Sequence, residues 1–178
     1  RVVLDRDDAG WARGVELVSL LGAQNAHVQL LLPGTEEHKS DFTDHIEAGL
    51  WSDSERFGGF VPVRVAEVAA HAAAGKIRAK AALVERACSE TQAWRARAES
   101  EPESESSDSA RAKAKRWAAE AEIRFEPLSD LLAEVQIRVA EAGTAWAVIA
   151  AEQAHAVVQS SRIAAQLSHH SIGIAVPP

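Results

Sequence analysis

Hydrophobic and polar positions divide the chain into a first third of short mixed elements and a remainder with helical periodicity. Val2-Val3-Leu4 is an apolar run that ends in acidic residues, which is typical of a buried parallel strand. Residues 9–21 place apolar side chains at helical spacing, and Gly22 stands where a helix C-cap is expected. Residues 27–32 predict a second strand, which Pro33-Gly34 ends. This order predicts a βαβ unit with a right-handed crossover.

Polar and helical segments follow this unit. We expect a short helix over residues 41–47, ended by Gly49, and then a connector over residues 52–64. The pattern then becomes helical and rich in alanine. Residues 99–109 read ESEPESESSDS, a composition that predicts a disordered hinge. We therefore predict an α/β domain at 1–63, an Ala-rich helix at 64–99, an acidic flexible linker at 100–109, long helices at 110–170 and a tail at 171–178.

The strongest periodicity lies in the last helical segment, which we expect to start at or just after Pro127. Ten of twelve positions at alternating spacings of three and four residues are apolar. This predicts a long, coiled-coil-like helix that packs on a partner helix, either residues 66–99 folded back as a hairpin or another subunit. The positions are Leu128, Leu132, Val135, Val139, Ala142, Trp146, Ile149, Gln153, Ala156, Ser160, Ile163 and Leu167.

Composition narrows the class of protein. The chain has 178 residues, 47% of them hydrophobic and 25% charged, which are values for a globular protein. A single cysteine, Cys88, excludes a disulfide framework and a thiolate zinc site. The formal net charge of -7 argues against a surface that is wholly a nucleic-acid footprint.

Location and origin can also be interpreted from composition. No apolar stretch is long enough for a membrane span and no secretory leader opens the chain, so we expect a cytoplasmic protein without a membrane partner. The absence of Met and the strand-like start predict a fragment of a longer protein. The excess of Ala and Arg suggests a GC-rich bacterial genome.

The chemistry is concentrated at the end of the first strand. Because side chains alternate along a strand, Asp5 and Asp7 lie on the same side, at the edge where open α/β sheets bind ligands. Two nearby carboxylates repel unless they share a cation or a proton, so this pair predicts a Mg²⁺ site. Gly10 permits a tight turn into the helix, and Asp8 is a candidate cap for it.

A second acidic cluster, with Lys39, Asp41 and Asp44, follows the second strand. In a parallel sheet this loop emerges beside the first one, so Asp41 and Asp44 are candidate ligands of the same metal and Lys39 a candidate phosphate contact. The alternative is that Ser40 and Asp41 cap the short helix and Lys39 is solvated. For His45 we expect a surface position.

A strand that ends in D-x-D-x-x-G, a helix, a strand that ends in Leu-Pro, then K-x-D-x-x-D and a glycine resembles the second half of a Toprim domain. The matching residues are Asp5, Asp7, Gly10, Pro33, Lys39, Asp41, Asp44 and Gly49. The pattern covers roughly residues 1–63 and is most similar to primase-type Toprims of bacteria, phages and mobile elements. The resemblance implies a DNA partner, Mg²⁺ or Mn²⁺ as cofactor, and nucleotidyl or phosphodiester transfer of the kind that DNA primases perform.

One part of the Toprim pattern is missing. The family carries a glutamate, its expected general acid or base, on a strand some tens of residues before D-x-D, and only four residues precede Asp5 here. We therefore expect this chain alone to bind metal without completing catalysis, and its catalytic residue is unknown. The haloacid dehalogenase family also has D-x-D after a strand, but Ala9-Gly10 fits Toprim better.

Two further interpretations stay open. The chain could be a non-catalytic helical interaction or oligomerisation protein that keeps a degenerate α/β unit. The basic stretch Arg111, Lys113, Lys115 and Arg116 could contact a nucleic-acid backbone, with Trp117 stacked on a base; the alternative is a solvated helix face with Trp117 toward the core. The acidic run before it could fold over these bases and screen them.

Overall fold

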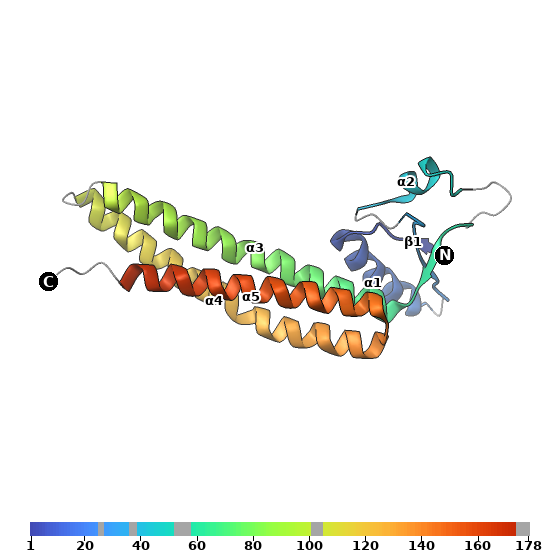
Figure 1. Ribbon diagram of the computed structural model, residues 1–178. Coiled ribbons are helices and arrows are strands. Elements are labelled where there is room, and N and C mark those ends of the chain that lie inside the picture. The colour runs from blue at the N-terminus through green and yellow to red at the C-terminus, as the bar shows by residue number, and fades with distance from the viewer. Residues whose placement is uncertain (25–26, 36–38, 52–57, 101–104, 174–178) are drawn as a thin grey trace. The chain divides into compact units, whose positions relative to one another are not determined.

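The computed structural model describes residues 1–24, 27–35, 39–51, 58–100 and 105–173, and the side chains of these residues up to 170. Two compact units share the chain: a sheet unit, residues 1–76 and 134–152, and a bundle unit, residues 77–133 and 153–178. Figure 1 shows the elements, which in chain order are β1 (Val2–Val3), α1 (Asp8–Gly22), β2 (Leu30–Leu32), α2 (Phe42–Glu47), β3 (Val61–Val63), α3 (Val65–Ser100), α4 (Glu105–Ala142) and α5 (Ala145–Gly173).

The sheet unit contains the predicted βαβ arrangement. β1 pairs in parallel with β2, with Val2 opposite Leu30 and Val3 opposite Leu31, and α1 connects the two strands. β2 is shorter than predicted and occupies only the last part of 27–32. We predicted a connector without strands at 52–64, and this was wrong for residues 61–63, which form β3 and pair antiparallel with β2. Pro62 lies in this edge strand, where a missing N–H is tolerated.

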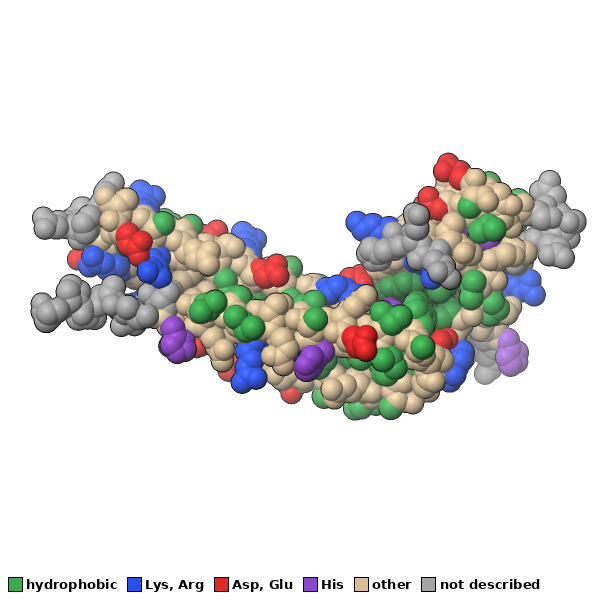
Figure 2. All heavy atoms as spheres, viewed as in Figure 1, with side chains coloured by type: hydrophobic (Ala, Val, Ile, Leu, Met, Phe, Trp, Pro, Cys, Tyr) green, Lys and Arg blue, Asp and Glu red, His purple; other side chains and the backbone are tan. Residues whose placement is uncertain are grey.

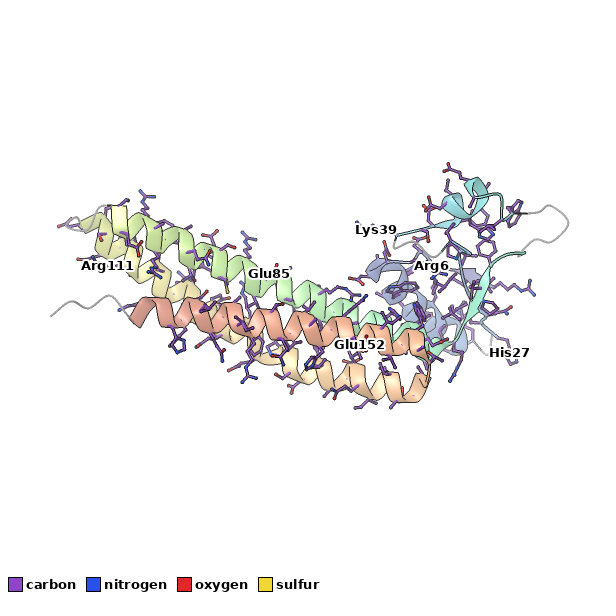
Figure 3. The ribbon with its side chains drawn as sticks, in the orientation of Figure 1. Arg6, His27, Lys39, Glu85, Arg111 and Glu152 are labelled. Carbon is purple, nitrogen blue, oxygen red and sulfur yellow. The ribbon has the colours of Figure 1, made fainter. Side chains whose placement is uncertain are left out.

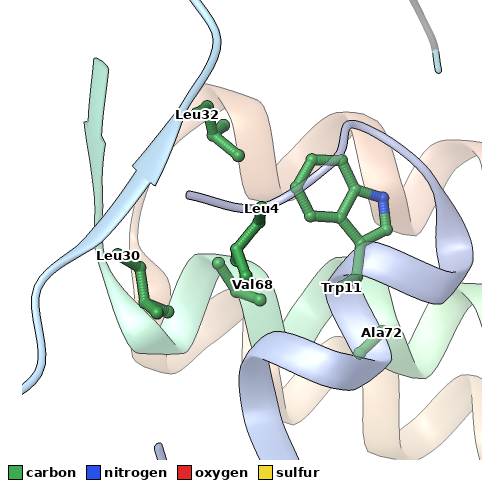
Figure 4. Close-up of a cluster of buried hydrophobic side chains, with 6 residues drawn as sticks. All are labelled: Leu4, Trp11, Leu30, Leu32, Val68 and Ala72. Atoms are coloured by element: carbon green, nitrogen blue, oxygen red, sulfur yellow. The ribbon is translucent and has the colours of Figure 1, made fainter. Parts of the chain in front are cut away.

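A cluster of apolar side chains holds the sheet unit together (Figure 4). It joins both parallel strands to α1 and to the start of α3, and its buried members are Leu4, Trp11, Leu30, Leu32, Val68 and Ala72. Trp11 also meets Trp146 edge to face, and His71 stacks on Trp146 with ring centroids 3.8 Å apart. The first strand, its helix and the long helices therefore share one core in this unit.

The bundle unit has a core of small side chains. Contacts within it join α3 to α4, where Ser107 Oγ donates to the carbonyl of Ala98, and α4 to α5, where His169 lies 3.2 Å from Glu122. Its buried residues are Ile77, Ala81, Val84, Ala87, Cys88, Thr91, Ala98, Ser107, Ala110, Ala114, Ala118, Ala121, Leu128, Ala154, Val158, Ser161, Ala165 and Ser168. Small side chains at the seams allow helices to approach closely but bury little apolar area per residue.

Part of the predicted acidic linker is helical. Residues 105–109 form the first turns of α4, and Ser107 is buried against α3, whereas residues 101–104 lie outside the described residues. The prediction failed because acidic side chains such as Glu105 and Asp108 favour the positive end of a helix. Likewise, residues 171–173 of the predicted tail belong to α5.

The prediction of one helix from Leu128 to Leu167 was wrong. α4 continues through Pro127 and ends at Ala142, and Gly143, at a φ of 65°, makes the turn to α5. The turn resets the helical register, so α5 buries Ala147, Ala150, Ala154, Val158, Ser161, Ala165 and Ser168 instead of the predicted seam. Ala70 of α3 and Ala142 of α4 pack with Ala147, so in the sheet unit the partners of α5 lie in the same chain.

Within the described ranges, every helix is too short or too polar to span a lipid bilayer.

Candidate functional site

Two loops of the sheet unit are joined by backbone hydrogen bonds beyond the ends of β1 and β2. The N–H of Arg6 donates to the carbonyl of Ser40, and the N–H of Lys39 donates to the carbonyl of Arg6, both at 3.0 Å. These bonds continue the ladder in which Leu4 N–H donates to the carbonyl of Leu31. The loop that follows β1 therefore lies beside the loop that precedes α2, as the sequence predicted.

Two other carboxylates act electrostatically on Asp5 where these loops meet. Partial desolvation, followed by the negative charges of Asp7 and Asp41, raises the pKa of Asp5 above its ordinary value of 3.8. Asp7 comes from the same loop as Asp5, whereas Asp41 comes from the loop before α2. Both acidic motifs thus act on Asp5, which remains exposed to solvent.

Asp7 is fixed by the helix that it begins. It is the N-cap of α1, and its Oδ1 accepts a hydrogen bond of 2.7 Å from the N–H of Gly10. The sequence had suggested Asp8 for this position. Asp8 instead lies in the first turn of α1, with its side chain against Gly75 of α3. The cap occupies one oxygen of Asp7.

Gly10 is required by a close approach of backbone to backbone. A Cβ atom at this position would lie 2.3 Å from the carbonyl oxygen of Asp5, a distance that real side chains do not reach. The prediction placed Gly10 at a tight turn. In the structure Gly10 lies in the first turn of α1, which packs directly on the end of the strand.

Asp41 and Asp44 form a capping box on α2. Oδ1 of Asp41 accepts from the N–H groups of Thr43 and Asp44, and Oδ2 of Asp44 accepts from the N–H of Asp41. The capping alternative is thus confirmed for Asp41. Ser40 does not cap; its hydroxyl donates to the carbonyl of Thr35. Of these two aspartates, only Asp41 contributes to the raised pKa of Asp5.

Lys39 and Arg6 are the basic residues of this edge (Figure 3). Lys39 is exposed and has a φ of 71°, a left-handed conformation that non-glycine residues seldom adopt. Sequence reasoning missed Arg6, because a single arginine between two aspartates carries no motif. Its guanidinium donates to the carbonyl of Pro33 through Nη2 at 2.9 Å and Nε at 3.2 Å, and so ties the loop after β2 to the end of β1.

His45 is buried, so the prediction of a surface position was wrong. Its side chain is completely inaccessible and stacks on Phe60, with ring centroids 3.8 Å apart. Its Nδ1 accepts from the N–H of Gly34, and its Nε2 lies 3.2 Å from the carbonyl oxygen of Gly58. His45 therefore joins α2 to the loop after β2 and to the segment before β3.

The donor set fits a water-completed magnesium site better than a closed protein cage. Within the described residues, no group of three or more His, Cys, Asp or Glu side chains is arranged to hold a metal ion. Mg²⁺ needs fewer than three protein ligands, because it keeps several waters and is usually bound by one or two carboxylates. Asp5 and the second oxygen of Asp7 are carboxylate donors of that kind, whereas Asp41 does not complete a three-ligand group with them in the described part of the chain.

No family model, no curated protein and no solved structure matches this chain. Assignment to a family therefore stays a proposal.

Proposed function

We propose that this chain is the metal-binding part of a Toprim-type DNA-processing protein, most similar to a DNA primase. Asp5 and Asp7 would hold Mg²⁺, with Mn²⁺ as an alternative, and Asp41 would support them. The single observation that carries the proposal is the convergence of two acidic motifs, joined through Arg6 and Ser40, on Asp5. A cation would stabilise the charged form of Asp5, and so would offset the desolvation and the repulsion by Asp7 and Asp41 that raise its pKa.

The caps support this proposal because they orient the carboxylates without consuming them. Asp7 and Asp41 each use Oδ1 to accept backbone N–H groups, which leaves Oδ2 of each for a cation. Asp44 holds the backbone of Asp41 in place. Lys39, on the neighbouring loop, would approach a phosphate group of the bound nucleic acid.

A bound Mg²⁺ would supply positive charge that orients a phosphate and stabilises its developing charge in nucleotidyl or phosphodiester transfer. The residues of this chain would position the cation and attract the phosphate. The proposal assigns no general acid or base.

Metal binding can be tested without activity. In a Mn²⁺ titration followed by the electron paramagnetic resonance signal of the free ion, we expect one site on the full chain, with Mg²⁺ as competitor. Asp5→Asn and Asp7→Asn should each weaken this site at least about tenfold, since each removes a charged ligand.

Asp130→Asn is the matched control, because Asp130 is an exposed aspartate of α4. It should leave the affinity unchanged. If all three variants lose affinity equally, the ion is held only by the general negative charge of the protein, and the proposed site does not exist.

A second candidate is a helical interaction or self-association protein. One observation favours it: large apolar side chains of the bundle unit are exposed while its core is built from small ones. Ile123, Ile163 and Leu167 are 61%, 56% and 65% exposed, and Figure 2 shows hydrophobic side chains on the surface of the long helices. Exposed apolar residues of this kind could pack against a helix of another protein or of a second copy of this chain.

Light scattering of the full chain against concentration tests self-association. If Ile163 and Leu167 form the contact, Ile163→Glu with Leu167→Glu should give a monomer of unchanged helicity. A wild-type chain that stays monomeric at every concentration would remove self-association and leave only docking to another protein.

A further inference from the structure

The bundle unit contains a hollow that the metal site does not use. It has a volume of about 270 Å³ and is lined by Arg116, Trp117, Glu120 and Arg124 of α4. Trp117 is half-buried, so part of its indole is accessible. A hollow with an indole wall and two guanidinium groups suits a planar, negatively charged ligand.

Ion pairing leaves a positive charge in this hollow. Nε of Arg124 lies 2.8 Å from Oε1 of Glu120, so these two lining residues neutralise each other. Arg116 is the remaining charged residue of the lining. The nearest acidic residue of the preceding run, Asp108, pairs with Arg111 at 3.3 Å. This pair lies within the first turns of α4, and the folding of the acidic run over the other basic residues stays a prediction.

A second indole lies on the adjoining helix, next to the basic stretch. Nζ of Lys113 lies 4.1 Å from the ring centre of Trp94, and the guanidinium carbon of Arg97 lies 5.6 Å from it. These cation–π contacts hold two long basic side chains against the bundle surface. The side chain of Lys113 is thereby restrained before any ligand binds, which reduces the conformational entropy that it loses on binding.

Helical spacing puts these groups on one face of α4. Lys113 and Trp117 are one turn apart, and Glu120 and Arg124 continue the same face by steps of three and four residues. Between Ser109 and Glu120 the chain has four basic residues and no acidic one. Figure 3 labels Arg111, which marks this part of the bundle unit. On this face, the accessible indole of Trp117 therefore lies next to the positive charges of Lys113 and Arg116.

We propose that this face of α4 binds single-stranded DNA, with a base stacked on Trp117 and backbone phosphates paired with Arg116 and Lys113. Stacking on an aromatic side chain accepts any base, and a small number of cations follows the backbone. Trp94 acts as the support that holds Lys113. This contact is separate from the carboxylates of the sheet unit and does not depend on a divalent cation.

The test is fluorescence anisotropy of a labelled oligothymidine with the full chain at low salt in EDTA. We expect Trp117→Ala to weaken binding about tenfold and Trp117→Phe to retain most of it, because phenylalanine also stacks. Arg116→Ala should reduce the slope of log affinity against log salt by about 0.7, the contribution of one phosphate contact to a single strand.

Lys115→Ala is the matched control for Arg116→Ala. It also removes one positive charge from α4, but Lys115 lies two residues from both Lys113 and Trp117 and so on another side of the helix. Equal losses for Lys115→Ala and Arg116→Ala, or an unchanged affinity for Trp117→Ala of unaltered helicity, would overturn the proposal. So would thymidine monophosphate that binds as tightly as the oligomer.

The metal proposal is tested separately. EDTA removes any cation from the anisotropy measurement, whereas the Mn²⁺ titration contains no oligomer. The two proposals can therefore fail independently.

Discussion

Asp7 and Asp41 are helix caps, and our proposal gives their second oxygens to a metal ion. A carboxylate has two oxygens, and in both residues Oδ1 accepts the backbone N–H groups of the helix. The cap fixes the rotamer and aligns the positive end of the helix dipole with the carboxylate. Among the described residues Asp5 caps neither α1 nor α2, and it is the aspartate whose pKa is raised.

The raised pKa of Asp5 makes a prediction about pH. The folded protein takes up this proton more readily than the unfolded chain, so stability falls as pH rises from about 3.8 through the raised pKa, and the cost persists above it. Without divalent cations, Asp5→Asn should therefore stabilise the protein at neutral pH. The gain should be about 0.5 kcal/mol or less, because solvent screens this exposed group.

Urea unfolding across the pH range checks this sign. The gain of Asp5→Asn should vanish below about pH 3.8, where both states are protonated. A variant that is less stable than the wild type at neutral pH would show that the carboxylate has a stabilising partner instead.

Gly10 offers a steric prediction with an internal control. Gly10→Ala should destabilise the protein by about 1–3 kcal/mol, because its Cβ would meet the carbonyl of Asp5 at 2.3 Å. Gly22→Ala, in the same helix with nothing within 4 Å of its Cβ, should be neutral or stabilise by up to about 1 kcal/mol. Thermal unfolding of both variants is the measurement. Equal changes in stability for Gly10→Ala and Gly22→Ala would mean that α1 does not pack on the end of the strand.

For individual residues, the sequence predicted the positions of the acidic side chains better than it predicted the contacts that a side chain makes. The sequence could predict that the loop with Asp5 and Asp7 lies beside the loop with Asp41, because the loops after adjacent parallel strands emerge at one edge of the sheet. The burial of His45 could not be predicted, because it depends on Gly34, Gly58 and Phe60, which contact the imidazole from distant parts of the chain.

Elements with local signals were predictable, and those with distant partners were not. β1, α1 and β2 follow from periodicity and from the helix stop near Gly22. β3 has only the residues Val-Pro-Val, and it is a strand because it pairs with Leu30–Leu32. Pro127 misled the prediction of helix ends, since α4 passes through it, whereas the turn at Gly143 supplied the true end.

Two buried serines of the bundle unit allow a matched test of helix packing. Ser107 donates to Ala98, whereas no partner for the hydroxyl of Ser161 is found among the described residues. Ser107→Ala should cost about 1 kcal/mol, and Ser161→Ala should be neutral or stabilising, because it removes an unsatisfied buried hydroxyl. Chemical denaturation of both variants is the measurement, and equal losses would contradict the assigned packing.

For the molecule as a whole, the seams of the bundle unit are its most unusual feature. The sequence indicated a helical partner, and the structure supplies partners within the chain through small residues, while the expected seam residues Ile163 and Leu167 face outward. The register of α5 could not be predicted, because the turn at Gly143 breaks the repeat and alanines are abundant on more than one face.

Substitution within this core predicts a contrast between neighbouring alanines. Ala121 is fully buried, so Ala121→Leu should overpack the seam and cost about 1–3 kcal/mol or more. Ala119 is exposed on the same helix, and Ala119→Leu should change the free energy of unfolding by less than about 0.5 kcal/mol. Tolerance of leucine at both positions would show that the helices are farther apart than in this structure.

The central claim is that two loops of the sheet unit hold one divalent cation. Paramagnetic broadening of backbone amide signals by a substoichiometric amount of Mn²⁺ tests it most directly. We expect the amides of Arg6, Gly10, Ser40 and Thr43 to broaden together and first, and Asp5→Asn to abolish the effect. Broadening in only one of the two loops, or spread evenly over the acidic residues of the protein, would contradict the account.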